Sequence, residues 1–299
     1  MPTTDFPKVA PATRTADFDP FEAALHATLV EMPYNSATEY HRVYGQDPDA
    51  RLGAACIYQT VDVARRAEAL GSPPATLLQD ERHVAAVFQD GGDIVVLDPY
   101  LLHLDPIRFP ASEVEQGSSS VEVPAAPVRL DADGKERFAR LSARYTAREG
   151  EYVIRLSYSR FSPTKNATVL SRHFSLRSSS EFVPDDFARD MKALLTHPEQ
   201  TSVSVRAVSP DLRATTEAIL PLHGFAERDF RADDIWLRSG QGAVLHGSDD
   251  RAATVWRQLE TSLALDSATL SDHLIGAARI YQQIADPTRA VAPYSLDDE

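Results

Sequence analysis

The chain has 299 residues, a formal net charge of −14 and a single cysteine. This length allows two or three subdomains with a sizeable core, and the acidic charge disfavours nucleic acid and anionic membranes as partners. One cysteine excludes an intramolecular disulfide, which fits a reducing compartment. Neither a secretion signal nor an apolar run of about eighteen residues is present, so we expect a cytoplasmic protein without a membrane span.

Helices are predicted for the first quarter of the chain. A loosely ordered arm to about residue 17 is followed by one helix over 20–30 and a second short one over 34–44. A third, amphipathic helix starts near Cys56, just after Gly53, and runs to about residue 70. We therefore expect residues 1–75 to form a helical bundle that carries the cysteine.

A β-hairpin is predicted next. Apolar runs on either side of Asp90-Gly91 indicate two strands joined by a tight turn within residues 83–98. With a two-residue loop at Asp90-Gly91, His83 lies directly opposite Asp98, with Cβ atoms about 4.5–5.5 Å apart. A loop of three or five residues would shift this pairing by one. Both faces of the hairpin are apolar, which predicts an inner pair of strands.

The rest of the middle segment also favours strands. Short apolar or alternating patterns predict strands over 107–109, 151–158 and 167–176, whereas the Ser/Glu/Pro-rich stretch over 111–127 is typical of a surface loop. Together with the hairpin, these strands predict an antiparallel β-barrel or sheet over 76–178.

The C-terminal segment, 179–299, mixes both kinds of element and is expected to form an α/β lid. The expected elements are a helix from about residue 184, short strands over 201–208, 217–222, 234–238 and 243–246, and helices over 248–263 and 268–284. The chain contains no internal repeat, no Gly-rich phosphate loop and no metal-binding spacing, so we expect no metal site.

Three residues in chain order supply the groups that thiol catalysis needs. Cys56 is a nucleophile, His83 a base that can hold its proton, and Asp98 a group that can orient the base. A helix N-terminus next to a histidine favours the reactive thiolate. Alone, each residue has a structural interpretation: a small buried hydrophobe, a core histidine and a strand terminator. His103 is a rival base, but it has no partner across the hairpin.

A cysteine at a helix start, followed by histidine and then by aspartate fifteen residues later, resembles the arylamine N-acetyltransferase superfamily. That family belongs to the papain-like and transglutaminase-like folds. The resemblance implies an α+β fold: a helical bundle with the nucleophile Cys56, a central antiparallel β-barrel or sheet with His83 and Asp98, and a C-terminal α/β lid.

The sequence departs from the family pattern at two places. Where the family has Arg-Gly-Gly-x-Cys, this chain has Gly53-Ala54, and Arg51 stands one position too early. After the aspartate, Pro-Tyr-Leu-Leu over 99–102 replaces the glycine stretch that lets acetyl-CoA approach in the family. The departures favour a divergent branch, and the chain also resembles the off-loading Dieckmann cyclases that close tetramate and pyridone rings.

The resemblance implies a Cys-His-Asp acyltransferase or cyclase of natural-product (antibiotic) biosynthesis. Cys56 would accept an acyl group from a thioester, and release would follow by cyclisation or by amide formation. The expected substrate is a small-molecule acyl thioester, carried on CoA or on the phosphopantetheine of an acyl carrier protein, with no tightly bound cofactor. A local basic patch at Arg65, Arg66 and Arg82 could receive such a carrier protein.

The substrate is expected in a roomy apolar pocket beside Cys56, contacted by Tyr100, Leu101 and Ile57. Two other functions stay open: an acetyl-CoA-dependent arylamine N-acetyltransferase and a non-catalytic binding module on the same scaffold. A protease or amidase of the wider fold is less favoured.

Overall fold

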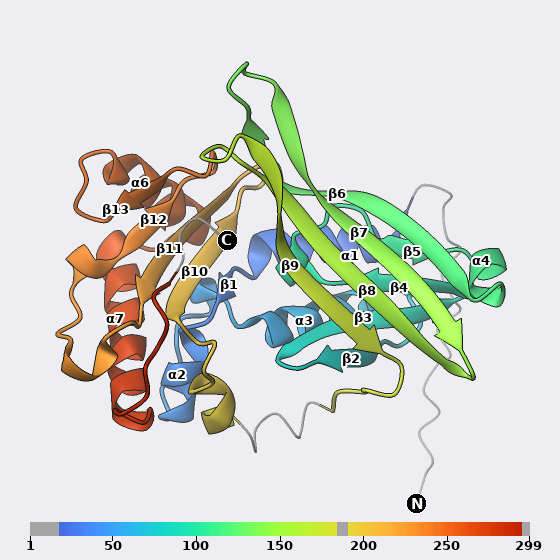
Figure 1. Ribbon diagram of the computed structural model, residues 1–299, viewed down its shortest axis with the longest axis horizontal. Helices are drawn as coiled ribbons and strands as arrows, with labels where there is room; N and C mark the ends of the chain where they lie inside the picture. Colours follow the sequence, from blue (N-terminus) through green and yellow to red (C-terminus); the bar gives the residue numbers. More distant parts are fainter. Residues whose placement is uncertain (1–17, 184–190, 295–299) are drawn as a thin grey trace, which may run out of the picture.

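The computed structural model describes residues 18–183 and 191–294, which form a mixed α+β fold with three antiparallel sheets (Figure 1). Its helices are α1 (Pro20–Glu31), α2 (Thr38–Val43), α3 (Cys56–Ala69), α4 (Ala111–Glu115), α6 (Ala252–Leu263) and α7 (Ser267–Ile284). In the described part of the chain none of the sheets closes into a barrel. Of the two predicted alternatives, a barrel or a sheet, the structure therefore has the open sheet.

Two four-stranded sheets are formed by the middle part of the chain. The first has the order β2-β3-β4-β5 and consists of β2 (Thr76–Asp80), β3 (His83–Asp90), β4 (Asp93–Leu97) and β5 (Ile107–Phe109). The second has the order β6-β7-β8-β9 and consists of β6 (Ser118–Leu130), β7 (Glu136–Arg148), β8 (Glu151–Ser162) and β9 (Ala167–Arg177). The long strands of the second sheet lie over the first (Figure 1).

The first hydrophobic core joins these two sheets to α1 and α3. Phe21 of α1, Val63 of α3, Phe88 of β3 and Leu141 of β7 are all fully buried members of it. The predicted inner position of the hairpin is confirmed, because β3 and β4 are the central strands of their sheet and are buried along most of their length. The hairpin is therefore rigidly held from both faces.

A second core lies in the C-terminal part of the chain. Its sheet has the order β1-β10-β11-β12-β13. The strands are β1 (Tyr34–Asn35), β10 (Ser202–Val208), β11 (Thr215–Pro221), β12 (Trp236–Arg238) and β13 (Val244–His246). The helices α6 and α7 pack against this sheet, and α2 packs against α7. β1 and α2 join this core, whereas α1 and α3 join the other, so the helices expected in one bundle are divided between two cores. The predicted domain boundaries at residues 75 and 178 stay a prediction.

The predicted helix over 34–44 is only half formed. Its first two residues instead make β1, in which Tyr34 pairs with Arg206 and Asn35 with Val205. The helix α2 then begins at Thr38. Pairing with a strand 170 residues away in the sequence leaves no local pattern, so helical periodicity could not reveal it.

The predicted surface loop over 111–127 is wrong. This segment contains α4 and most of β6. Pro124 and Pro127 suggested a loop, but β6 is an edge strand of its sheet, where proline is tolerated, and its register shifts between Ala125 and Val128.

The remaining predicted elements of the described chain form close to their expected bounds. The start of the helix expected from about residue 184 lies outside the described residues. None of the helices in the described ranges is both long and apolar enough to cross a membrane.

Candidate active site

The segment before Cys56 is fixed by a glycine that no other residue could replace. Gly53 has φ 75° and ψ −156°, a region that is essentially restricted to glycine. A Cβ atom here would lie 1.9 Å from the carbonyl oxygen of Pro33. The adjacent Ala54 donates its N–H to that carbonyl and accepts one from Asn35. The chain therefore enters α3 along β1, with its direction set by the backbone.

Cys56 is the first residue of α3, as predicted. The N-cap residue, Ala55, makes no side-chain hydrogen bond to the first turn of the helix. One turn later, the Thr60 hydroxyl donates to the carbonyl oxygen of Val84 at 2.8 Å. This bond ties the start of α3 to the start of β3 and so fixes the cysteine relative to His83.

The hairpin turns at a different place from the one predicted. Asp90 pairs with Asp93, and the two loop residues are Gly91 and Gly92. Both have positive φ, 62° and 98°, as expected for a type I′ turn. The loop has the predicted length but starts one residue later, because two consecutive glycines meet the positive-φ requirement better than Asp90-Gly91.

The later turn changes the register of the hairpin. Ala86 pairs with Leu97, whereas the predicted loop would have paired it with Val95. The direct pairing of His83 with Asp98 is therefore wrong. A shift of two residues nevertheless keeps both side chains on one face of the sheet, where they are diagonal neighbours within reach of each other.

His83 and Asp98 are in contact. Nε2 of His83 lies 2.6 Å from Oδ2 of Asp98, and the two residues are 3% and 0% exposed. The other ring nitrogen, Nδ1, is buried and has no hydrogen-bond partner of good geometry among the described residues. The Cys56 thiol interacts with the same imidazole through charge and as a hydrogen-bonding group. Nδ1 is thus the atom that can exchange a proton with the thiol.

The protonation of His83 depends on its partners. Burial lowers the pKa of His83, but the charge and the hydrogen bond of Asp98, together with the interaction with Cys56, outweigh burial and raise it to about 9. The imidazole is therefore a cation at neutral pH. A cation next to a thiol favours the thiolate, which is the nucleophilic form.

The rival base, His103, has a different place. It is buried, which lowers its pKa. Its Nδ1–H donates to the carbonyl of Asp105 at 2.8 Å, and its Nε2 accepts the backbone N–H of Asp98 at 2.8 Å. His103 therefore holds the backbone of Asp98 as a neutral imidazole, and it does not line the cavity at Cys56.

Two aromatic rings enclose His83. Phe174 of β9 stacks on the imidazole, with ring centroids 3.7 Å apart and planes 16° apart. The Tyr100 ring lies 5.5 Å from it. Sequence reasoning missed Phe174, because alternation within 167–176 marks it only as a strand residue. Its contact with His83 needs the packing of β9 against the hairpin.

A cavity of about 490 Å³ opens at Cys56. Its wall includes Cys56, His83, Tyr100, Arg82, Arg172 and Phe174. The pocket is roomy, as expected, but it is not apolar, because Asp80, Glu81, Arg82, Arg172 and His173 all contribute to its wall. This wall suits a polar or charged substrate better than a purely hydrocarbon one.

The three predicted substrate contacts have different positions. Tyr100 lines the cavity. Leu101 is 1% exposed in the first core, and Ile57 is 4% exposed and packs against Val84. Neither Leu101 nor Ile57 is among the described residues of the cavity wall, because both side chains are packed in hydrophobic clusters. In the same residues no group of three or more His, Cys, Asp or Glu side chains could hold a metal ion.

Comparison with known proteins gives no match. No family model, no curated protein and no solved structure matches the chain. What the site can do is therefore argued from its own geometry.

Proposed function

We propose that the protein is a cysteine-dependent acyl-transfer enzyme of natural-product biosynthesis. Cys56 would accept an acyl group from a thioester, and the acyl group would leave by ring closure of the Dieckmann type, giving a tetramate or pyridone, or by amide formation. The observation that carries the proposal is the buried imidazole of His83, which contacts Asp98 on one side and interacts with Cys56 on the other.

In the first half-reaction, the Cys56 thiolate attacks the thioester carbonyl carbon. A new carbon–sulfur bond forms, the bond to the leaving thiol breaks, and protonated His83 supplies the proton that the leaving thiolate takes. Backbone N–H groups at the start of α3 would stabilise the oxyanion, each donor being worth about 10²–10³ in rate. Asp98 keeps the imidazole oriented and stabilises its positive charge.

In the second half-reaction, His83 is neutral and acts as a base. It removes a proton from the attacking group, which is an acidic carbon or an amide of the same acyl chain in a cyclase and an external amine in a transferase. The attack breaks the acyl–sulfur bond and returns Cys56 to its thiolate form, which again pairs with protonated His83.

The resemblance to the arylamine N-acetyltransferase superfamily supports a related alternative, turnover of acetyl-CoA with a simple aniline. The cavity wall weighs against it, because Asp80, Glu81 and Arg172 at the site do not match a small apolar acceptor. A non-catalytic binding module is the second alternative. It does not explain why an imidazole is held between a carboxylate and the single cysteine.

The test is intact-protein mass spectrometry after incubation with acyl thioesters of N-acetylcysteamine of varied chain length. The proposal expects an acyl adduct or thioester turnover with the native chain, and neither with Cys56→Ala. His83→Gln, which removes the base and keeps a polar side chain, is expected to lower the rate by at least about 10²-fold. Absence of an adduct and of turnover across the whole panel would refute the proposal.

A further inference from the structure

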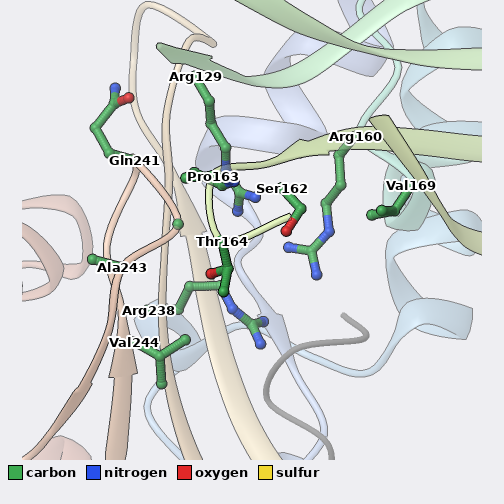
Figure 2. A pocket seen from close by; sticks show the side chains of 11 residues that line it. Arg129, Arg160, Ser162, Pro163, Thr164, Val169, Arg238, Gln241, Ala243 and Val244 are labelled. Atoms are coloured by element: carbon green, nitrogen blue, oxygen red, sulfur yellow. The ribbon is translucent and has the colours of Figure 1, made fainter. Parts of the chain in front are cut away.

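A second cavity lies between the β6–β9 sheet and the C-terminal sheet, and it is lined by arginines. It has a volume of about 400 Å³, with Arg129 from β6, Arg160 from β8 and Arg238 from β12 in its wall. Figure 2 shows the three guanidinium groups pointing into the same space, next to the hydroxyl of Ser162. Three cationic side chains from three strands therefore face one cavity.

These arginines are buried, and two of them, Arg129 and Arg160, are incompletely paired within the described residues. Their exposures are 3% for Arg129, 7% for Arg160 and 5% for Arg238. Arg238 pairs with Glu217 at 2.8 Å, and in the described part of the chain Arg129 donates only to the carbonyl of Phe161. The Nε atoms of Arg129 and Arg160 have no hydrogen-bond partner, and within the described residues no carboxylate forms an ion pair with either arginine.

The cluster is electrostatically costly without an anion. Burial, followed by the charge of Arg160, lowers the pKa of Arg129 to about 10. Burial and the charge of Arg238 likewise lower the pKa of Arg160. Among the described residues no carboxylate pairs with Arg129 or Arg160, so an oxyanion in the cavity would supply the missing charge and acceptors. Guanidinium groups bind phosphate and carboxylate with paired, charge-assisted hydrogen bonds.

A small pocket of about 30 Å³ lies between the arginine cavity and the cysteine site and shares wall residues with both. Arg160 and Arg238 line this small pocket, together with Tyr100, Arg172 and Arg206. Tyr100 and Arg172 in turn line the cavity at Cys56. In the wall of the small pocket, Arg172 donates to the Tyr100 hydroxyl at 3.0 Å, and Arg206 donates to the Tyr100 carbonyl at 2.9 Å.

The separation of the two ends can be taken from β9. Val169 lines the arginine cavity, and Phe174 stacks on His83 in the cysteine site. These residues are five positions apart on one strand, which corresponds to at most roughly 16 Å because β9 has a register shift between them. An extended phosphopantetheine arm also spans roughly 16 Å between its sulfur and its phosphorus, by standard bond lengths and angles.

We propose that the arginine cavity binds a phosphate group of the thioester donor while the thioester carbonyl lies at Cys56. The link to Cys56 rests on the proposed function, whereas the binding of phosphate does not. The donor would then be a phosphorylated pantetheine thioester. Its phosphate belongs either to free CoA or to the arm of a carrier protein, and the same cavity would accept both.

The experiment measures binding by calorimetry on the full chain with Cys56→Ala, which removes the chemistry. The ligands are 4′-phosphopantetheine, CoA, inorganic pyrophosphate and pantetheine without phosphate. We expect 4′-phosphopantetheine to bind at least about tenfold more tightly than pantetheine, and its affinity to fall with added salt. Equal affinity for CoA and 4′-phosphopantetheine indicates a carrier arm, and much tighter binding of CoA indicates the free nucleotide.

The diagnostic variant is Arg160→Gln, because Arg160 has no ion-pair partner and its removal strands no carboxylate. It is expected to weaken phosphate binding at least about tenfold, and its melting temperature without ligand should match or exceed that of the parent. Arg148→Gln, at an exposed position of β7, is the matched control and should bind like the parent. Equal binding of phosphate by both variants, or no binding by the parent, would overturn the inference.

The two proposals fail separately. N-acetylcysteamine thioesters carry no phosphate, so acylation of Cys56 by them tests the cysteine chemistry alone. If they acylate Cys56 and no phosphate ligand binds, only the arginine cavity inference is wrong. If phosphate binds through Arg160 and Cys56 is never acylated, only the proposed function is wrong.

Discussion

The contact between His83 and Asp98 makes the stability of the protein depend on pH, and Asp98→Asn should remove that dependence. In the folded protein the pKa of His83 is raised from 6.5 to about 9, with Asp98 as the largest raising influence. A raised pKa stabilises the fold fully below the unfolded value of 6.5, and this stabilisation is lost as the pH rises through 9. In Asp98→Asn burial is no longer opposed by a carboxylate, so the pKa of His83 falls.

The size of the effect follows from the two values. The gap between 6.5 in the unfolded chain and about 9 in the folded protein corresponds to roughly 3 kcal/mol. Because both residues are buried, solvent screening reduces this figure little. We therefore expect the native chain to exceed Asp98→Asn in free energy of unfolding by about 3 kcal/mol more at low pH than at high pH.

The assay is urea unfolding of both proteins at about pH 5.5 and about pH 9.5, on either side of the two pKa values. Other titrating groups contribute equally to both proteins and cancel in the difference. The control repeats Asp98→Asn in a His83→Gln background, where the difference should no longer change with pH. A constant difference between the native chain and Asp98→Asn at both pH values would refute the assignment of a His83–Asp98 ion pair.

Three other substitutions test how the site is built. Gly53→Ala places a methyl group against the Pro33 carbonyl and should lower the free energy of unfolding by about 3 kcal/mol or more, measured by urea unfolding. Thr60→Val removes the hydroxyl bond from α3 to β3; it should cost about 1–3 kcal/mol and slow acylation by thioesters, and unchanged acylation would contradict its positioning role. His103→Leu leaves the backbone N–H of Asp98 without its acceptor and should cost about 1–3 kcal/mol, while Cys56 remains capable of acylation if His103 is not the base.

Local patterns were sufficient for much of the site. The helix that begins at Cys56 and the existence of a hairpin between His83 and Asp98 follow from apolar periodicity and turn residues, and both elements are present in the structure. The register did not follow, because two turns one residue apart were compatible with the same loop composition. The side chains still meet because a shift of two residues preserves the face of a strand.

Long-range packing was not accessible from the sequence. Phe174 reaches His83 only because β9 packs against the hairpin, and β1 exists only because β10 lies beside it. The charged wall of the cysteine cavity has the same origin, since Arg172 comes from β9 and the sequence gives no sign of its direction. The arginine cavity likewise joins strands that are distant in the chain.

The most direct test of the central claim is the alkylation rate of the single cysteine as a function of pH. Because Cys56 is the only thiol of the chain, iodoacetamide labelling followed by mass spectrometry reports on it alone. If His83 is the cation that pairs with its thiolate, the native chain will still react readily near pH 6, and His83→Gln will react at least about tenfold more slowly there. Identical rates for the two proteins from about pH 6 to pH 9 would contradict the account.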